Sequence, residues 1–275
     1  MELTGILNYE FVQRAFLAGL FIAAVSSTLG VFLVLRRFSL IGDGLAHITF
    51  GSVAFVMLLG VSPLYITLAA LPLVMISSLA ILKLTQSKRI QGDAAIGIVS
   101  SVGIASGIIL ASLSNGYNLD LFSYLFGNIL TVTRIELLLS FIVFLTVAAT
   151  VIIFYDDLFA VTFDEELART MGVKTERINT ILFLLTAVAA VLAMKVAGIM
   201  LVSAMVILPP LTALQLSLSF RLTIVAAVLF SILSVICGII AAFLLNLPAG
   251  GTIVICNIGF LLFIFGAKKI LPSRR

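Results

Sequence analysis

The chain has 275 residues, of which 62% are hydrophobic and only 10% are charged. A soluble domain carries about 25% charged residues, so this chain has too few charges to cover a water-facing surface, and a soluble globular fold is excluded. The formal net charge of +4 comes from basic residues clustered between apolar runs. It reports membrane topology and gives no evidence for a nucleic-acid partner.

Long apolar runs recur along the whole chain. The uncharged run 222–267 can cross a bilayer twice, because one helical crossing takes about 20 residues. A membrane β-barrel would require segments of about ten residues with alternating polarity, and these are absent. The sequence predicts an all-α polytopic membrane protein, one transmembrane bundle over 1–275 with eight to nine crossings. Nine are expected, near 15–35, 44–60, 64–83, 94–113, 137–155, 178–194, 198–219, 222–245 and 250–267.

The basic residues predict the orientation of these crossings. An odd number places the two termini on opposite sides of the membrane. With the N-terminus outside, thirteen of the 16 Lys and Arg residues fall in cytoplasmic stretches, and only Arg14, Arg134 and Lys195 fall outside. This positive-inside bias predicts an external N-terminus and a cytoplasmic C-terminus.

The second predicted crossing contains an acid and the only histidine of the chain, in IGDGLAHITFG (41–51). On a helix, Asp43 and His47 share one face. Ionisable groups inside a bilayer are costly and default to functional hypotheses. Carboxylate oxygen and imidazole nitrogen suit zinc and accept manganese or ferrous iron, so both residues are predicted metal ligands. The alternative is a hydrogen-bonded Asp–His pair at a helix start, with Asp43 as the N-terminal cap.

Two segments in the middle of the chain are informative. The stretch 94–112 is dense in small residues, which allow close helix–helix contact in lipid; they form two faces, Gly97 with Ser101 and Ala105, and Gly103 with Gly107. The segment 119–134 is apolar but short for a crossing. It is interpreted as a half-helix that lines the outer vestibule, with a helix lying on the membrane surface as the alternative.

The main hydrophilic block is 156–179, on the predicted cytoplasmic side. Within it, FDEELARTMG (163–172) predicts a short amphipathic helix with acids in its first turn and Gly172 as its stop. Phe163, Leu167 and Met171 make one apolar stripe. The acidic polar face suits a protein partner better than anionic lipid; a solvated connector on the membrane surface is the alternative.

Two prolines and one missing motif complete the pattern. Pro209 and Pro210, in AGIMLVSAMVILPPLTA (197–213), are interpreted as a possible hinge or as a kink fixed by packing. No G-x-x-x-x-G-K-[ST] loop and no catalytic set occurs. The chain is therefore expected to be no enzyme and to have no ATPase site of its own, so any ATP hydrolysis requires a separate subunit.

Several stretches, in order along nearly the whole chain, resemble the membrane permeases of zinc/manganese-type ABC importers. These stretches are RRFSLIGDGLAHITFGSVAF, GDAAIGI, LFGNIL, FDEELARTMG and VAGIMLVSAMVILPPLTA. Where the family often has Asp-Ala-x-Ser-His-Ala, this chain has Asp43-Gly44-Leu45-Ala46-His47-Ile48. The ligand positions are kept and the helix around them is altered.

The resemblance implies an importer permease bundle in a bacterial plasma (inner) membrane. It implies a second permease copy, two cytoplasmic ATP-binding subunits and an extracellular or periplasmic metal-binding protein as partners, with zinc or manganese as transported substrate and no permanently bound cofactor. Asp43 and His47 correspond to the metal-coordinating pair. The ATPase-coupling element corresponds to 163–172, with Phe163, Asp164, Glu165, Glu166, Leu167, Ala168, Met171 and Gly172.

Two other functions are weighed. An ion-coupled secondary transporter would show inverted repeats and more intramembrane acids. A siderophore- or vitamin-type ABC permease would be longer and has no reason to carry an Asp–His pair. The metal, whether zinc, manganese or iron, is left open by the pair itself.

Overall fold

The computed structural model of the chain describes residues 10–62, 65–86, 92–113, 132–245 and 247–270. Regular structure in these residues is helical throughout, which confirms the all-α fold. Eight of the described helices are long and apolar enough to cross a membrane. The half-helix expected over 119–134 lies largely outside the described residues, so the structure leaves that interpretation as a prediction.

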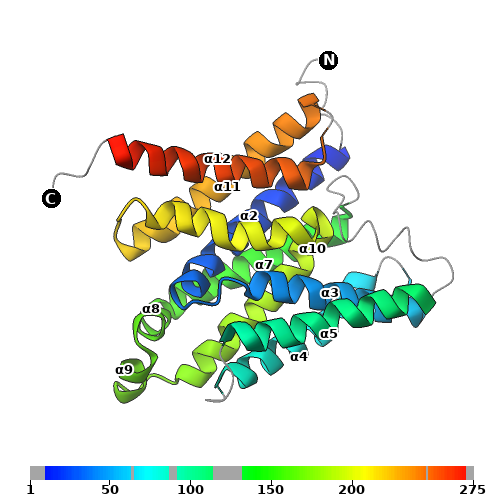
Figure 1. The fold of residues 1–275 in the computed structure, drawn as a ribbon, viewed down its shortest axis with the longest axis horizontal. Coiled ribbons are helices and arrows are strands. Elements are labelled where there is room, and N and C mark those ends of the chain that lie inside the picture. Colours follow the sequence, from blue (N-terminus) through cyan, green and yellow to red (C-terminus); the bar gives the residue numbers. More distant parts are fainter. Residues whose placement is uncertain (1–9, 63–64, 87–91, 114–131, 246, 271–275) are drawn as a thin grey trace.

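The helices follow the predicted crossings closely (Figure 1). Their bounds are α2 Glu10–Leu35, α3 Ile41–Leu58, α4 Ile66–Gln86, α5 Gly92–Leu113, α7 Arg134–Ile153, α8 Tyr155–Phe163, α9 Glu165–Thr170, α10 Thr175–Leu214, α11 Phe220–Leu245 and α12 Ala249–Ile270.

The helix labelled α10 consists of two helices that meet at Gly198. This residue has φ 78° and ψ 169°, a backbone region that essentially only glycine adopts. In Figure 1 the part before Gly198 runs away from α9 and the part after it turns back. The second part contains a shorter apolar helix, Leu201–Leu214. The sequence predicts separate crossings over 178–194 and 198–219, and the structure confirms a boundary between them.

Pro209 and Pro210 lie inside the helix that follows Gly198, so the interruption of helical backbone in α10 is elsewhere. They lie where α10 packs tightly against α2. A Cβ atom on Gly30 of α2 would come within 2.2 Å of the Val206 carbonyl oxygen and 2.9 Å of Pro210 Cγ. The hinge role of the two prolines stays a prediction.

The core lies where α2, α3 and α10 meet. Phe32 of α2, Leu45 of α3 and Phe183 of α10 are fully buried. In contrast, α5, α11 and α12 bury only a minor part of their apolar spans. Large apolar side chains exposed on these outer helices are expected for surfaces in contact with lipid tails. The predicted metal-binding segment is therefore on one of the most enclosed helices of the bundle.

Glycines let α5 pack directly on the backbone of α3. A Cβ atom on Gly103 would lie 2.6 Å from Ile48 Cα and 2.9 Å from the His47 carbonyl oxygen. This confirms close packing for the face formed by Gly103 and Gly107. The other predicted face is different, because Gly97, Ser101 and Ala105 are all exposed. For that face the packing prediction is wrong within the described chain.

Candidate metal site and coupling helix

Asp43 lies in the first turn of α3, and His47 follows one turn later. The N-cap position belongs to Leu40, which has no side chain able to cap, and no side-chain capping bond is present there. The alternative interpretation of Asp43 as the N-terminal cap is therefore wrong. The carboxylate remains available for another role, and an acid in the first turn is in any case favourable toward the positive end of the helix dipole.

The two side chains face each other at a distance suited to a shared cation. Asp43 Oδ2 and His47 Nε2 are 3.5 Å apart, longer than the usual limit of about 3.2 Å for an N–H···O hydrogen bond. Two ligands bound tetrahedrally to one zinc ion at about 2.1 Å each would lie about 3.4 Å apart. The observed separation of 3.5 Å is close to that of two ligands of one ion.

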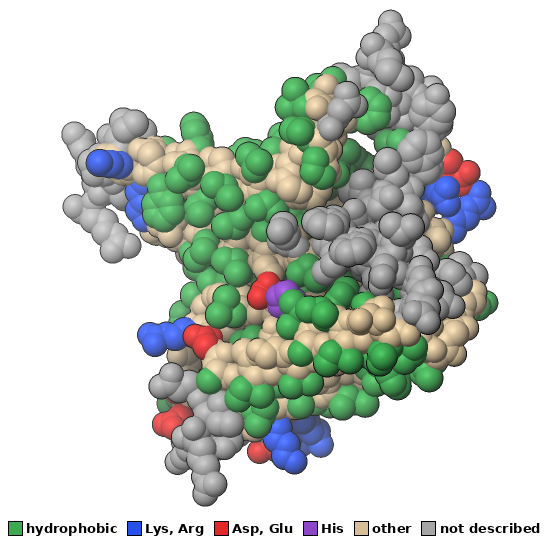
Figure 2. Space-filling model, turned by 45° about the vertical axis from the view of Figure 1, so that its right-hand side comes forward, with side chains coloured by type: hydrophobic (Ala, Val, Ile, Leu, Met, Phe, Trp, Pro, Cys, Tyr) green, Lys and Arg blue, Asp and Glu red, His purple; other side chains and the backbone are tan. Residues whose placement is uncertain are grey.

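Asp43 and His47, called the metal pair from here on because they are the predicted ligands, are both partly accessible. The side chains are 48% and 23% exposed, respectively. In Figure 2 the only histidine of the chain, in purple, lies beside an acidic side chain in the middle of one face, bordered by hydrophobic side chains. The His47 Nδ1 atom is buried and makes no hydrogen bond within the described part of the chain. An ion approaching from this face would therefore meet the carboxylate and Nε2.

A third residue holds the carboxylate in place. The Ser203 hydroxyl donates a hydrogen bond of 3.2 Å to Asp43 Oδ1. Ser203 comes from the part of α10 that follows Gly198, and the Cα atom of Ser203 packs near Gly42 of α3. Sequence reasoning did not identify this residue; its only signal is a small polar side chain inside the apolar run 197–213. Among the described residues, no third His, Cys, Asp or Glu completes a metal site.

The predicted amphipathic helix at 163–172 is present and shorter than expected. Asp164 is the N-cap of α9, and Asp164 Oδ1 accepts a hydrogen bond of 2.9 Å from the Leu167 backbone N–H. Glu165 and Glu166 occupy the first turn. The chain leaves the helix through Gly172, whose φ of 90° suits glycine at a helix C-terminus. The stop at Gly172 and the acidic first turn are thereby confirmed.

The residues predicted as one apolar stripe lie on two consecutive helices, because Asp164 is extended between Phe163 of α8 and Leu167 of α9, and all of them are largely exposed. Phe163, Leu167 and Met171 are 61%, 57% and 73% exposed, whereas Ala168 is buried against the rest of the protein. Phe163 ends α8 and packs its ring on Phe159, at a centroid distance of 4.7 Å. A cavity of about 590 Å³ next to α9 is lined in part by Met171 and by residues of α8 and α10. Exposed apolar side chains next to a cavity form a surface of the kind that can bind a protein partner.

Comparisons with known proteins agree with this architecture. The model of the ABC 3 transport family matches residues 8–268. The manganese transport system membrane protein MntC of Halalkalibacterium halodurans is 32% identical, over 98% of this chain and 92% of that protein. The zinc uptake system membrane protein ZnuB of Haemophilus influenzae is 29% identical, over 95% of this chain and 100% of that protein.

A solved structure gives the same result for the fold. The structure of PsaBC from Streptococcus pneumoniae in complex with Fab superposes with a TM-score of 0.84 and 30% sequence identity, covering 95% of this chain and 93% of that one. Because the family model and these relatives cover nearly all of the sequence, the chain belongs to the ABC 3 transport family, as a membrane permease of the manganese and zinc ABC transport type.

Proposed function

We propose that this permease imports a divalent transition metal into the cytoplasm and that Asp43 and His47 coordinate the ion on its way. The observation that carries the proposal is the 3.5 Å separation of Asp43 Oδ2 and His47 Nε2 on a partly accessible face. Ser203 supports it by fixing the orientation of the Asp43 carboxylate. Carboxylate oxygen and imidazole nitrogen together suit zinc, manganese or ferrous iron.

Two protein ligands favour transient binding. A tight structural zinc site has four ligands, whereas conduction requires an ion that can leave as well as enter. The remaining coordination positions are filled by water or by the same pair from a second permease copy. A homodimer with two ATP-binding subunits and an extracellular or periplasmic metal-binding protein is the assembly we propose, in a bacterial plasma membrane.

The ATP-binding subunit docks on the exposed stripe of Phe163, Leu167 and Met171 together with the adjacent cavity. This places α9 in the cytoplasm, with the N-terminus of the chain outside and the C-terminus inside, as the positive-inside bias predicts. One contact supports this arrangement. Lys268, near the end of α12, donates a 2.9 Å hydrogen bond to the Gln215 carbonyl oxygen just after α10. The ends of α10 and α12 therefore lie at the same side.

The test is uptake by the permease reconstituted in liposomes with its ATP-binding subunits and its metal-binding protein. Radioactive Mn²⁺ and Zn²⁺ are supplied separately and in competition. We expect His47→Ala and Asp43→Asn to abolish ATP-dependent uptake while the complex still assembles. Asp156→Asn, an exposed aspartate in the first turn of α8, is the matched control and should transport normally. Normal uptake by the His47 variant would remove the pair from the mechanism, and uptake without ATP would favour a secondary transporter.

A further inference from the structure

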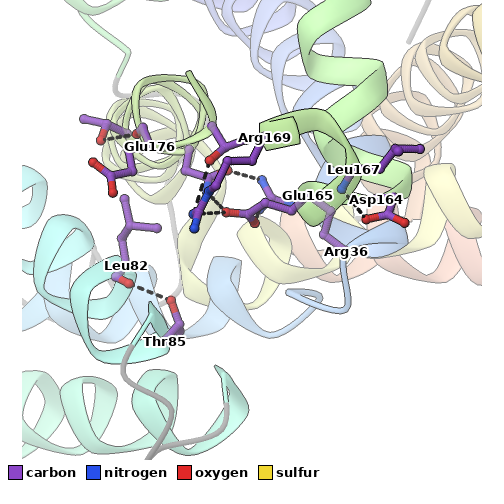
Figure 3. Close-up of polar contacts among 11 residues, drawn as sticks. Arg36, Leu82, Thr85, Asp164, Glu165, Leu167, Arg169 and Glu176 are labelled. Carbon is purple, nitrogen blue, oxygen red and sulfur yellow. Dashed lines mark hydrogen bonds and ion pairs between the residues drawn. The ribbon is translucent and has the colours of Figure 1, made fainter. Parts of the chain in front are cut away.

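One acidic side chain of α9 points into the protein. Glu165 accepts a hydrogen bond of 3.0 Å at Oε2 from the Arg36 guanidinium and one of 2.9 Å at Oε1 from the Asn179 amide. The same guanidinium donates a 2.7 Å hydrogen bond to the Asn179 side-chain oxygen. Each of these three side chains therefore binds the other two. Figure 3 shows Arg36 and Glu165 meeting beside α9, and we call the three residues the α9 cluster.

The α9 cluster joins three elements that are distant in sequence. Arg36 directly follows the end of α2, Glu165 is the first residue of α9, and Asn179 lies near the start of α10. Within α9, only Glu165 and Ala168 are not exposed. The cluster attaches α9 to the bundle together with a 3.4 Å hydrogen bond from the Arg169 guanidinium to the Thr175 hydroxyl of α10. The residues of the stripe proposed to bind the ATPase are exposed instead.

Burial makes this attachment hard to separate. The side chain of Arg36 is only 8% exposed, and Asn179 is 1% exposed. Burial lowers the pKa of the Arg36 guanidinium below its ordinary value, and Glu165 opposes that effect by favouring the charged form. The Glu165 side chain is 35% exposed, so moving it away costs most at Arg36, whose charge would stay buried without its acidic partner. A displacement of α9 is therefore expected to carry the ends of α2 and α10 with it.

A tight turn continues from the cluster toward α3. Arg37 adopts a left-handed conformation with φ 62°, and the Phe38 N–H donates a 2.8 Å hydrogen bond to the Leu33 carbonyl oxygen. This backbone pattern is the Schellman motif, which fixes the exit of a helix. The Phe38 ring packs edge-on against Phe183 of α10, with centroids 5.4 Å apart. The turn is thereby fixed to α2 and to α10 at once.

Two routes lead from the cluster to the metal pair. The first is the turn itself: Ile41 begins α3 with a 3.1 Å backbone hydrogen bond to Phe38, and Asp43 follows within the same helical turn. The second is α10, which carries Asn179 before Gly198 and Ser203 after it, the latter bonded to Asp43. Both routes end at the same carboxylate.

We infer that Arg36, Glu165 and Asn179 are positioning residues for transport, which lock α9 to the bundle so that a displacement of α9 shifts Asp43. This inference rests on the proposed function, because it requires an ATP-binding subunit that acts on α9. It adds a role for Arg36 and Asn179, which lie outside the predicted ATPase-coupling segment 163–172, and gives Glu165 of that segment the role of their partner.

The test measures Mn²⁺ uptake and ATP hydrolysis in the same proteoliposomes and takes their ratio. Arg36→Lys keeps the charge but loses the forked geometry that binds two partners. Asn179→Leu removes both amide hydrogen bonds at similar volume. Both variants should lower the Mn²⁺ imported per ATP by at least about fivefold, the lower end of typical coupling between sites, while hydrolysis continues. Arg134→Lys, at an exposed position at the start of α7 and outside the cluster and both routes, is the matched control and should keep the normal ratio.

Binding of Mn²⁺ to the purified permease without ATP is measured in parallel. If the Arg36 and Asn179 variants still bind Mn²⁺ but import less Mn²⁺ per ATP, then the α9 cluster acts on coupling and not on metal binding. If the unmodified complex imports neither Mn²⁺ nor Zn²⁺ with ATP, the proposed function fails. If it does import metal and both variants keep its ratio, the inference is overturned while the proposed function stands.

A second measurement leaves the cluster intact and so applies even where those variants do not assemble. Spin labels are attached at Thr170→Cys on α9 and Leu40→Cys in the turn, both exposed positions, after Cys237→Ser and Cys256→Ser. The distance between the labels should be the same in the nucleotide-free and ATP-bound complex, because α9 and the turn move together. A distance that changes between these two states overturns the inference.

Discussion

The Ser203 hydroxyl donates a hydrogen bond to one oxygen of Asp43, and the other oxygen of the same carboxylate faces His47. A residue from α10 therefore orients a ligand that α3 supplies. This arrangement leaves Oδ2 turned toward His47 Nε2, and it makes the geometry of the proposed ligand pair depend on the relative position of two helices.

Ser203→Ala is the direct test of this relationship. Loss of a group that orients a metal ligand typically lowers affinity by about 10- to 100-fold. Because the carboxylate keeps its contact with His47, we expect the lower end of this range. The Mn²⁺ concentration that gives half-maximal uptake should rise about tenfold. Ser101→Ala, on the exposed face of α5, is the matched control. Equal half-saturation in both variants would mean that Asp43 is positioned without Ser203.

Gly103→Ala should disturb the packing of α5 against α3 next to His47. The added methyl group would lie 2.6 Å from Ile48 Cα and 2.9 Å from the His47 carbonyl oxygen, so α5 must move away from α3. Overpacking of this kind costs about 1–3 kcal/mol, which thermal unfolding of the purified protein measures. At Gly97 a Cβ atom would meet nothing within 4 Å, and Gly97→Ala should be as stable as the unmodified protein or more so. If Gly103→Ala is as stable as Gly97→Ala, the close contact between α3 and α5 would be contradicted.

Truncation of the exposed stripe should weaken ATPase docking without unfolding the permease. Leu167 and Met171 are 57% and 73% exposed, and their loss removes no core contact. Interface anchors typically cost more than about 1 kcal/mol each when truncated, so Leu167→Ala with Met171→Ala should lower the affinity for the ATP-binding subunit by about tenfold or more. Leu262→Ala, an exposed leucine of α12, is the control. Unchanged co-purification together with unchanged affinity would place the docking surface elsewhere.

Local sequence patterns predicted most of the fold and the proximity of Asp43 and His47. Hydropathy marks the crossings because each one must bury its backbone polar groups inside a helix. Asp43 and His47 stand four residues apart on one helix, so their proximity follows from helical geometry alone. Ser203 lies 160 residues from Asp43, and Asn179 lies 143 residues from Arg36. Contacts between such distant positions arise from packing, and no local pattern encodes them.

The interruption of α10 shows the limit of proline as a signal. Pro209 and Pro210 suggested a break, yet both lie within the helix, where neighbouring helices compensate for the missing N–H groups. The interruption is at Gly198, where the backbone requires a conformation that glycine alone adopts readily. A single glycine in an apolar run is also common in unbroken membrane helices, so its role becomes visible only in the folded chain.

Gly198→Ala therefore tests whether the turn-back of α10 is needed for function. At φ 78° and ψ 169°, a side chain costs about 1–3 kcal/mol, and the strain can be relieved only if the backbone at residue 198 changes. Ser203 follows five residues later, so a change there would move the Ser203 hydroxyl away from Asp43. We expect a lower unfolding temperature and weaker Mn²⁺ uptake than for Gly259→Ala, a position in α12 with nothing within 4 Å of an added Cβ. Equal stability and equal uptake in these two variants would contradict this prediction. They would show that an alanine at position 198 causes no backbone strain and that Ser203 still reaches Asp43.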